Sequence, residues 1–128
     1  MALIVLDTTV LIDTLRGRPA GQRVLGLREA GDQPATTAIS IEEVARGARQ
    51  KEHAGIRRLF DGLLVLDIGR AEAELAGGWR REHASQGVTL HQADCLIAAC
   101  AVIAGAQLAT GNPKDFPMLD VQHWPVGN

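Results

Sequence analysis

Short runs of apolar residues that end on polar side chains recur along this chain, and helical patterns separate them. The first run covers residues 1–6 without a polar side chain and ends at Asp7. A continuous apolar run of this length predicts a strand that is buried on both faces of a parallel sheet. Further strands are expected at residues 33–39, 63–68 and 107–110, with a last edge strand at 121–124.

Between these strands, apolar residues recur at helical spacing. Helices are expected at residues 8–13, 20–30, 50–63, 70–84 and 92–104, and another from residue 40 onward. Capping-box patterns mark two of the helix starts, one from Ser40 to Glu43 and one from Thr89 to Gln92. The alternation of strands and helices predicts a single α/β domain over residues 1–128, with a mostly parallel sheet and right-handed crossovers.

Composition adds limits to this picture. The chain has 128 residues, of which 46% are hydrophobic, enough for the core of one domain. Cys95 and Cys100 are five positions apart on a helix, so they point in different directions and are expected to be free core residues in a reducing cytoplasm. No apolar run reaches the roughly 18 residues of a membrane span, and a soluble protein that is not exported is expected. The net charge of −2 argues against indiscriminate binding along nucleic acid, but permits a local basic face.

Acidic and amide side chains lie where strands end or helices begin. They are Asp7, Glu43, Asp94, and Asn112 with Asp115 in one turn. Carboxyl ends of parallel strands share one edge of a sheet, so these groups are expected to converge there. Gathered carboxylates repel one another unless a cation neutralises them, and oxygen ligands suit Mg²⁺ or Mn²⁺. Each acid also has a structural alternative, because Asp7 could cap a helix, Glu43 could complete a capping box, and Asp94 could favour a helix N-terminus.

The sequence resembles the PIN-domain nucleases, specifically the VapC-type toxins of bacterial type II toxin–antitoxin pairs. Four motifs carry the resemblance, and they read LDTTVLID at residues 6–13, SIEEVARG at 40–47, DCLIAA at 94–99 and TGNPKDF at 110–116. In order and spacing they cover essentially the whole chain. The resemblance implies a three-layer PIN-like α/β fold, with a small sheet flanked by helices.

The resemblance also implies a Mg²⁺- or Mn²⁺-dependent endoribonuclease, in which Asp7, Glu43 and Asp94 are catalytic metal ligands. Glu43, and not Glu42, matches the glutamate that precedes a glycine by four residues. The fourth ligand is open: Asn112 occupies the position of a common aspartate, and Asp115 is the alternative acid. Hydroxyls of Thr8 or Thr9 and of Thr110 would orient carboxylates or water.

Such an enzyme hydrolyses phosphodiester bonds of structured RNA such as tRNA or ribosomal RNA, through a metal-activated water. RNA contacts are expected from Arg16, Arg18, Arg46 and Lys114, and a wider basic flank from Arg49, Lys51, Arg57 and Arg58. A solvated helix face explains that flank equally well. The four histidines, His53, His83, His91 and His123, are scattered, and surface or structural roles are expected for them.

VapC-like proteins usually form homodimers and are inhibited by a cognate VapB-like antitoxin whose C-terminal segment lies in a groove near the active site. Five apolar residues are candidates for lining such a groove, with core packing as the alternative: Val10, Leu11, Leu15, Leu59 and Leu63.

Two other functions fit parts of the sequence. A phospho-receiver domain would use Asp67 as phosphate acceptor with Thr110 and Lys114 as switch residues, but the first strand ends on a lone acid where a receiver needs a pair. A catalytically silent PIN-like binding module is the second, and Asn112 is the feature that favours it. The RNA target, the cleavage site, the antitoxin and the number of metal ions are beyond the sequence.

Overall fold

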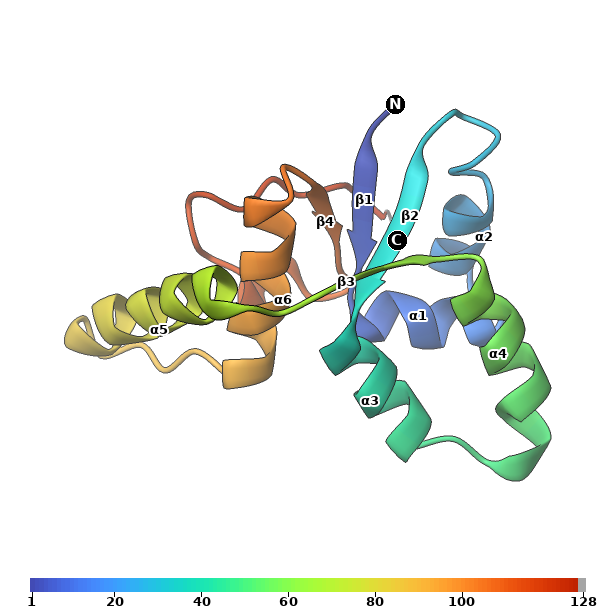
Figure 1. Cartoon of the computed structure of the whole chain (residues 1–128), viewed down its shortest axis with the longest axis horizontal. Coiled ribbons are helices and arrows are strands. Elements are labelled where there is room, and N and C mark those ends of the chain that lie inside the picture. The colour runs from blue at the N-terminus through green and yellow to red at the C-terminus, as the bar shows by residue number, and fades with distance from the viewer. Residues whose placement is uncertain (127–128) are drawn as a thin grey trace.

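A four-stranded sheet forms the centre of the computed structural model, which describes residues 1–126 (Figure 1). The strands are β1 (Leu3–Leu6), β2 (Gln33–Thr37), β3 (Leu64–Leu66) and β4 (Gln107–Ala109). All neighbouring pairs are parallel, in the order β3-β2-β1-β4. The predicted parallel sheet is therefore confirmed, and the carboxyl ends of all four strands lie along one edge.

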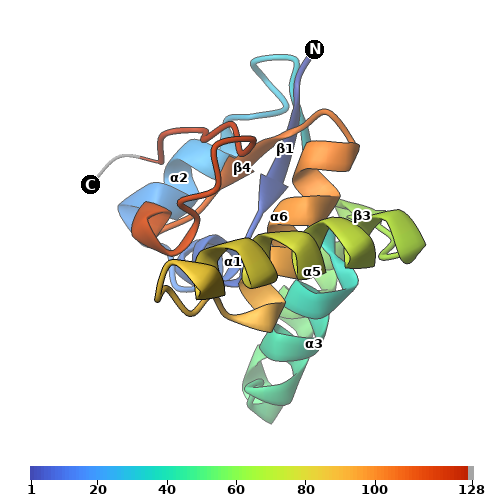
Figure 2. The ribbon, with the colours of Figure 1, turned by 90° about the vertical axis from the view of Figure 1, so that its left-hand side faces the viewer.

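Helices cover both faces of this sheet. They are α1 (Thr8–Leu15), α2 (Pro19–Leu25), α3 (Ala38–Arg46), α4 (His53–Asp61), α5 (Arg70–Ser85) and α6 (Gln92–Ile103), with short 3₁₀ turns η1 (Gln50–Glu52) and η2 (Pro113–Asp115). Helices α5 and α6 pack on each other on one side, and α1, α2 and α4 lie on the other (Figures 1 and 2). This is the expected α/β fold of three layers.

Alternate residues of β1 face the two layers of helices. Ile4 and Leu6 belong to one core cluster, which includes Val10 and Leu11 of α1, whereas Val5 belongs to the other, which includes Ile97 of α6. Each of these side chains is at most 1% exposed. Burial on both faces explains why the first strand has no polar side chain before Asp7.

Helix α6 is buried in its central part, as its apolar sequence predicted. Six of its twelve residues are buried, including Cys95 and Cys100, and both cysteines are free. The chain then turns at Gly105, whose φ of +68° suits glycine, and enters β4. Helix α6 thus connects Asp94 at its first turn to Thr110 beyond β4. Among residues 1–126, no helix is long and apolar enough to cross a membrane.

The third helix begins earlier than predicted. Thr37, the last residue of β2, is the N-cap of α3, and its Oγ1 accepts a hydrogen bond of 3.3 Å from the backbone N–H of Ser40. Ser40 is buried inside the helix. The predicted capping box from Ser40 to Glu43 is wrong, because a hydroxyl at the strand end already caps the helix. Glu43 therefore has no capping role.

Other boundaries also differ from the sequence expectations. Helix α2 ends at Leu25 instead of residue 30, and the segment expected to be helical from residue 50 starts with a 3₁₀ turn. Helix α6 has His91 as N-cap without a side-chain bond, so the capping box at Thr89 is wrong. The expected strand at 121–124 is reduced to one bridge between Leu108 and His123. Residues 127 and 128 of the predicted domain lie outside the described residues.

Candidate active site

Asp7 lies directly after β1 and is the N-cap of α1. Its Oδ1 accepts hydrogen bonds from the Thr9 hydroxyl at 2.6 Å and the Val10 backbone N–H at 3.1 Å, and its Oδ2 accepts one from the Thr110 hydroxyl at 2.5 Å. The residue is only 4% exposed. Burial raises the pKa of Asp7, and the hydrogen bonds from Thr110 and Thr9 only partly oppose that rise. Asp7 thus caps the helix, as one alternative predicted, and also presents a fixed carboxylate at the sheet edge.

The loop after β4 is fastened to the start of α1 by the same threonines. The Thr9 hydroxyl accepts a bond of 2.9 Å from the Gly111 N–H, and the Thr110 hydroxyl accepts one of 3.0 Å from the Asn112 N–H. A Cβ on Gly111 would lie 3.1 Å from the Thr9 Oγ1, so glycine permits this close approach. The loop that carries Asn112 is therefore held at a defined distance from Asp7.

Glu43 points toward the same edge from α3. Its Oε1 accepts a hydrogen bond of 2.6 Å from the Thr8 hydroxyl, and Thr8 adjoins Asp7 in the chain. Glu43 is half-buried, whereas Glu42 is exposed. The structure thus brings Glu43, and not Glu42, beside Asp7. The two threonines have different partners: the Thr9 hydroxyl bonds to Asp7, and the Thr8 hydroxyl bonds to Glu43.

Asp94 completes the group from the first turn of α6, where it is half-buried. Burial raises the pKa of Asp94, and the negative charges of Asp115, Asp7 and Glu43 raise it further, while the charge of His91 opposes them in part. Three carboxyl groups from three other segments therefore act on Asp94 at this edge. The sequence indicated no role for His91 at the site, but His91 precedes Asp94 by about one helical turn and its charge acts on that carboxylate.

Asn112 and Asp115 flank the 3₁₀ turn η2, and both are exposed. The backbone N–H of Asp115 donates to the Asn112 carbonyl at 3.0 Å, which closes the turn. Asn112 makes no side-chain cap bond to this turn. Among the charges that act on Asp94, that of Asp115 has the largest effect.

Oxygen donors of this kind suit Mg²⁺ or Mn²⁺, and a divalent cation would relieve the repulsion at Asp94. Among residues 1–126, however, no three His, Cys, Asp or Glu side chains stand in a ready-made ligand arrangement. Glu43 and Asp94 are half-buried and Asp115 is exposed, so their side chains have room to turn toward an ion. The oxygen donors of these residues therefore fit such a cation in chemistry, and a ligand set would form only after their side chains turn.

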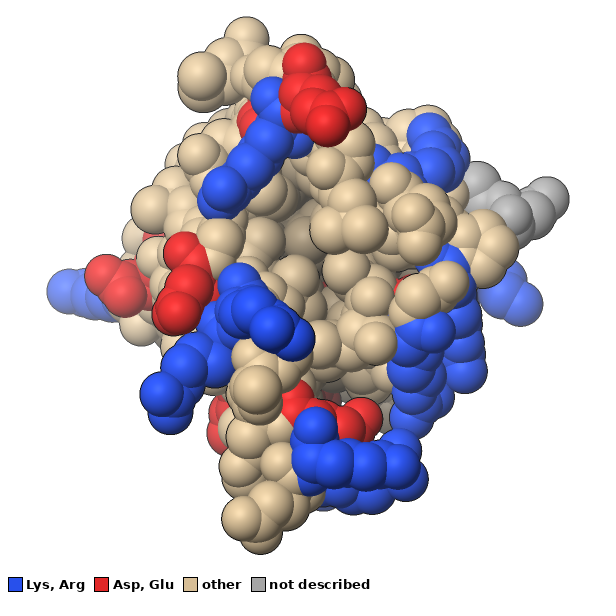
Figure 3. All heavy atoms as spheres, turned by 90° about the vertical axis from the view of Figure 1, so that its right-hand side faces the viewer, with Lys and Arg blue, Asp and Glu red and all other residues tan. Residues whose placement is uncertain are grey.

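The predicted RNA-contacting residues differ in their partners. Arg18 forms an ion pair of 2.8 Å with Asp13, and Arg49 one of 3.3 Å with Glu52. Arg16, Arg46 and Lys114 are exposed. On the face that includes α4, basic side chains lie around an area without charged side chains, and acidic side chains lie among them (Figure 3). The basic flank is thus partly neutralised.

Two of the histidines have the structural roles that the sequence indicated. His83 Nδ1 bonds to the Trp79 carbonyl at 3.0 Å, and His123 Nε2 to the Phe116 carbonyl at 3.2 Å. The first bond lies within α5, and the second lies within the C-terminal segment.

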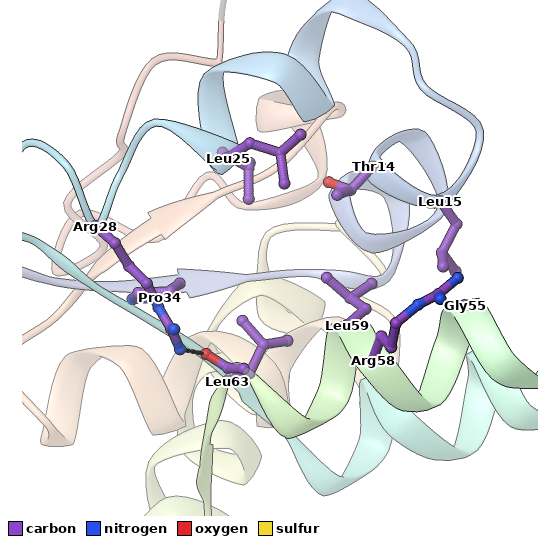
Figure 4. A pocket seen from close by; sticks show the side chains of 11 residues that line it. Thr14, Leu15, Leu25, Arg28, Pro34, Gly55, Arg58, Leu59 and Leu63 are labelled. Atoms are coloured by element: carbon purple, nitrogen blue, oxygen red, sulfur yellow. Dashed lines mark hydrogen bonds between the residues drawn. The ribbon is translucent and has the colours of Figure 1, made fainter.

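An apolar groove of about 430 Å³ lies between α1, α2 and α4. Leu25 of α2 faces Leu59 and Leu63 across it (Figure 4). Leu15 also lines it, so three of the five predicted groove residues are in place. Val10 and Leu11 are fully buried in the core, and their assignment to a groove is wrong because the inner face of α1 packs on β1.

The geometry contradicts the phospho-receiver alternative. Asp67 follows β3 and Thr110 follows β4, with β2 and β1 between them. Three strand spacings separate the two residues by roughly 14 Å, too far for both to contact one phosphoryl group.

Comparisons with known proteins agree with this arrangement. The PIN domain family model matches residues 4–121, which include all the candidate site residues. Ribonuclease VapC19 of Mycobacterium tuberculosis is 34% identical over 118 residues, covering 88% of this chain and 91% of the relative.

Two solved structures share the fold closely. VapBC-1 from nontypeable Haemophilus influenzae has a TM-score of 0.81 at 26% identity, with 97% of this chain and 98% of that chain covered. DNA-bound VapBC from Salmonella typhimurium has a TM-score of 0.85 at 23% identity, with 99% and 100% covered, and supports the fold alone. The chain therefore belongs to the PIN-domain family, among the relatives of the VapC-type toxins.

Proposed function

We propose that this protein is a Mg²⁺- or Mn²⁺-dependent endoribonuclease toxin that cleaves structured RNA such as tRNA or ribosomal RNA. The observation that carries the proposal is the gathering of Asp7, Glu43, Asp94 and Asp115 at the carboxyl edge of the sheet, where the charges of the other three raise the pKa of Asp94. Such repulsion costs folding free energy, and a bound cation would offset that cost. The relative named ribonuclease VapC19 supports RNA as the substrate.

Asp7, Glu43 and Asp94 would hold the metal, with Asp115 or Asn112 as the fourth ligand. When bound, the ion would lower the pKa of a water molecule and stabilise charge on the scissile phosphate. Thr9 and Thr110 fix the two oxygens of Asp7, and Thr8 fixes one oxygen of Glu43. These hydroxyls hold the carboxylates in place, which is the usual role of groups behind metal ligands.

Exposed cations near this edge would contact the RNA backbone. Arg16, Arg46 and Lys114 are exposed and suited to phosphate contacts. Arg18 would contribute less, because its guanidinium is already paired with Asp13. With two phenylalanines, two tryptophans and no tyrosine in the chain, shape and charge are the means of recognition.

A VapB-like antitoxin is the proposed partner, because the VapBC-1 structure, at 26% identity, is a structural relative of this chain. The apolar groove at Leu25, Leu59 and Leu63 would receive an apolar antitoxin segment, and Arg28 and Arg58, which also line it, would favour acidic side chains on that segment.

We also propose that the toxin is a homodimer in the cytoplasm. Light scattering of the chain alone and with its co-expressed antitoxin measures both assemblies. A chain that is monomeric on its own would contradict the homodimer. A Leu59→Asp variant that still binds the antitoxin would contradict the assignment of the groove.

Cleavage of folded RNA in the presence and absence of divalent ions tests the function. Total tRNA and ribosomal RNA are expected to be cut at discrete sites with Mg²⁺ or Mn²⁺, and EDTA should stop the reaction because the carboxylates alone cannot activate water. Re-addition of the ion should restore cleavage at the same sites. RNA that stays intact with both ions, while still binding the protein, would identify the silent binding module instead.

A further inference from the structure

A second, smaller cavity adjoins the candidate active site. It has a volume of about 160 Å³ and lies between α1, α3 and α4, with Glu43 among its lining residues. Glu43 also contacts Thr8, next to Asp7. A nucleotide with its phosphate at the carboxylates would therefore have this cavity within reach of its base or of the neighbouring base.

The walls of the cavity are apolar. Its apolar lining comes from three helices: Ile12 and Leu15 of α1, Val44 of α3 and Ile56 of α4. Gly47 also lines it and adds no side chain. An aliphatic lining suits a flat ring, because stacking against apolar side chains is how flipped bases are held in enzymes.

Two charged side chains also line the cavity. Glu52 lines it from η1, and its Oε1 accepts bonds from Arg49 N at 2.9 Å and Arg49 Nε at 3.3 Å. These bonds lower the pKa of Glu52, which favours the carboxylate, a group that only accepts hydrogen bonds. Arg16, the C-cap of α1, lines the cavity as well. The lining thus combines a fixed acceptor for amino groups with a cation for a phosphate.

We propose that this cavity binds one unpaired nucleobase of the RNA substrate, with Glu52 accepting a hydrogen bond from an exocyclic amino group and Arg16 contacting the adjoining phosphate. The proposal rests on the proposed nuclease function for its substrate class. Adenine and cytosine carry an exocyclic amino group that can donate to Glu52, whereas uracil has a carbonyl oxygen at the corresponding position. The cavity would then select A or C over U beside the cleaved bond.

Amide chemical shifts of the metal-free protein, recorded during titration with AMP, CMP and UMP, test the cavity without any cleavage. Shifts are expected at Val44, Gly47 and Ile56, with AMP or CMP binding about three- to tenfold more tightly than UMP. Glu52→Gln should reduce that ratio to about one. The matched control Glu29→Gln, an exposed glutamate after α2, should leave the ratio unchanged.

Cleavage-site sequencing in Mg²⁺ separates this proposal from the function on which it rests. Wild type should prefer A or C next to the cut, and Glu52→Gln should cut with that preference lost. Cleavage without base preference, together with no shifts at the cavity, would overturn the base site and leave the nuclease intact. Shifts at the cavity in a protein that cuts no RNA would support the base site and overturn the nuclease function. Equal shifts with all three nucleotides, unaffected by Glu52→Gln, would also overturn the proposal, because Glu52 would then select no base.

Discussion

Asp94→Asn is expected to abolish metal-dependent RNA cleavage and to make the metal-free protein more stable. The variant removes a ligand, so cleavage should fall by about 100-fold or more, since disturbing even the groups behind metal ligands costs up to that much. It also removes the repulsion that Asp94 experiences from Asp115, Asp7 and Glu43. Relief worth up to about 1 kcal/mol would raise Tm in EDTA by roughly 2–5 °C.

The pH dependence of stability gives this prediction a second readout. Asp94 and Asp7 both have pKa values raised above the ordinary 3.8, so the folded chain binds their protons more tightly than the unfolded chain does. Metal-free wild type should therefore be most stable below pH 3.8 with respect to these groups and lose stability as the pH rises through their raised pKa values. Asp94→Asn should show a smaller loss, and Mg²⁺ should stabilise wild type at neutral pH but not the variant.

Thermal unfolding at several pH values, with EDTA or Mg²⁺, measures these effects beside the cleavage assay. Asp120→Asn is the matched control, because Asp120 is an exposed aspartate and is not among the charges that raise the pKa of Asp94. The control should match wild type in both assays. Wild-type cleavage by a folded Asp94→Asn protein would show that the assigned site is not the catalytic one.

The parts of the fold that sequence predicted well are those in which one local pattern had a single physical cause. The apolar run before Asp7 meets helices on both faces of the sheet, so it required a central strand. The smooth apolar surface of α6 likewise required burial, and half of that helix is buried. Because such elements are recognisable from their pattern, the residues at their ends, including Asp7 and Asp94, could be placed at one edge of the sheet.

Other features depend on contacts that no local pattern encodes. Ser40 has the sequence of a cap, yet Thr37 at the end of β2 takes that role because the strand already positions its hydroxyl. The choice between Thr8 and Thr9 stayed open in the sequence, and it is decided by the direction of each side chain at the start of α1. The cavity beside Glu43 combines α1, α3, η1 and α4, so Glu52 had no sequence signal beyond its charge.

The fourth ligand is the second question with a large expected effect. Asp115→Asn should lower cleavage about ten- to hundredfold at limiting Mg²⁺ and raise the ion concentration that gives half-maximal cleavage. Its charge raises the pKa of Asp94 more than that of Asp7 or Glu43 does. Asn112→Ala should change cleavage by less than about threefold, because its contact with the site runs through its backbone N–H to Thr110.

Mg²⁺ titrations of cleavage by the two variants, with Tm in EDTA as the second measurement, decide between these residues. Asp115→Asn should raise the metal-free Tm in the same direction as Asp94→Asn, since both remove one member of the repelling pair. Asn112→Ala removes no charge and should leave that Tm nearly unchanged. If Asn112→Ala instead raised the Mg²⁺ requirement more than Asp115→Asn, the amide oxygen of Asn112 would be the ligand. The negative charge of Asp115 would then act on Asp94 only through space.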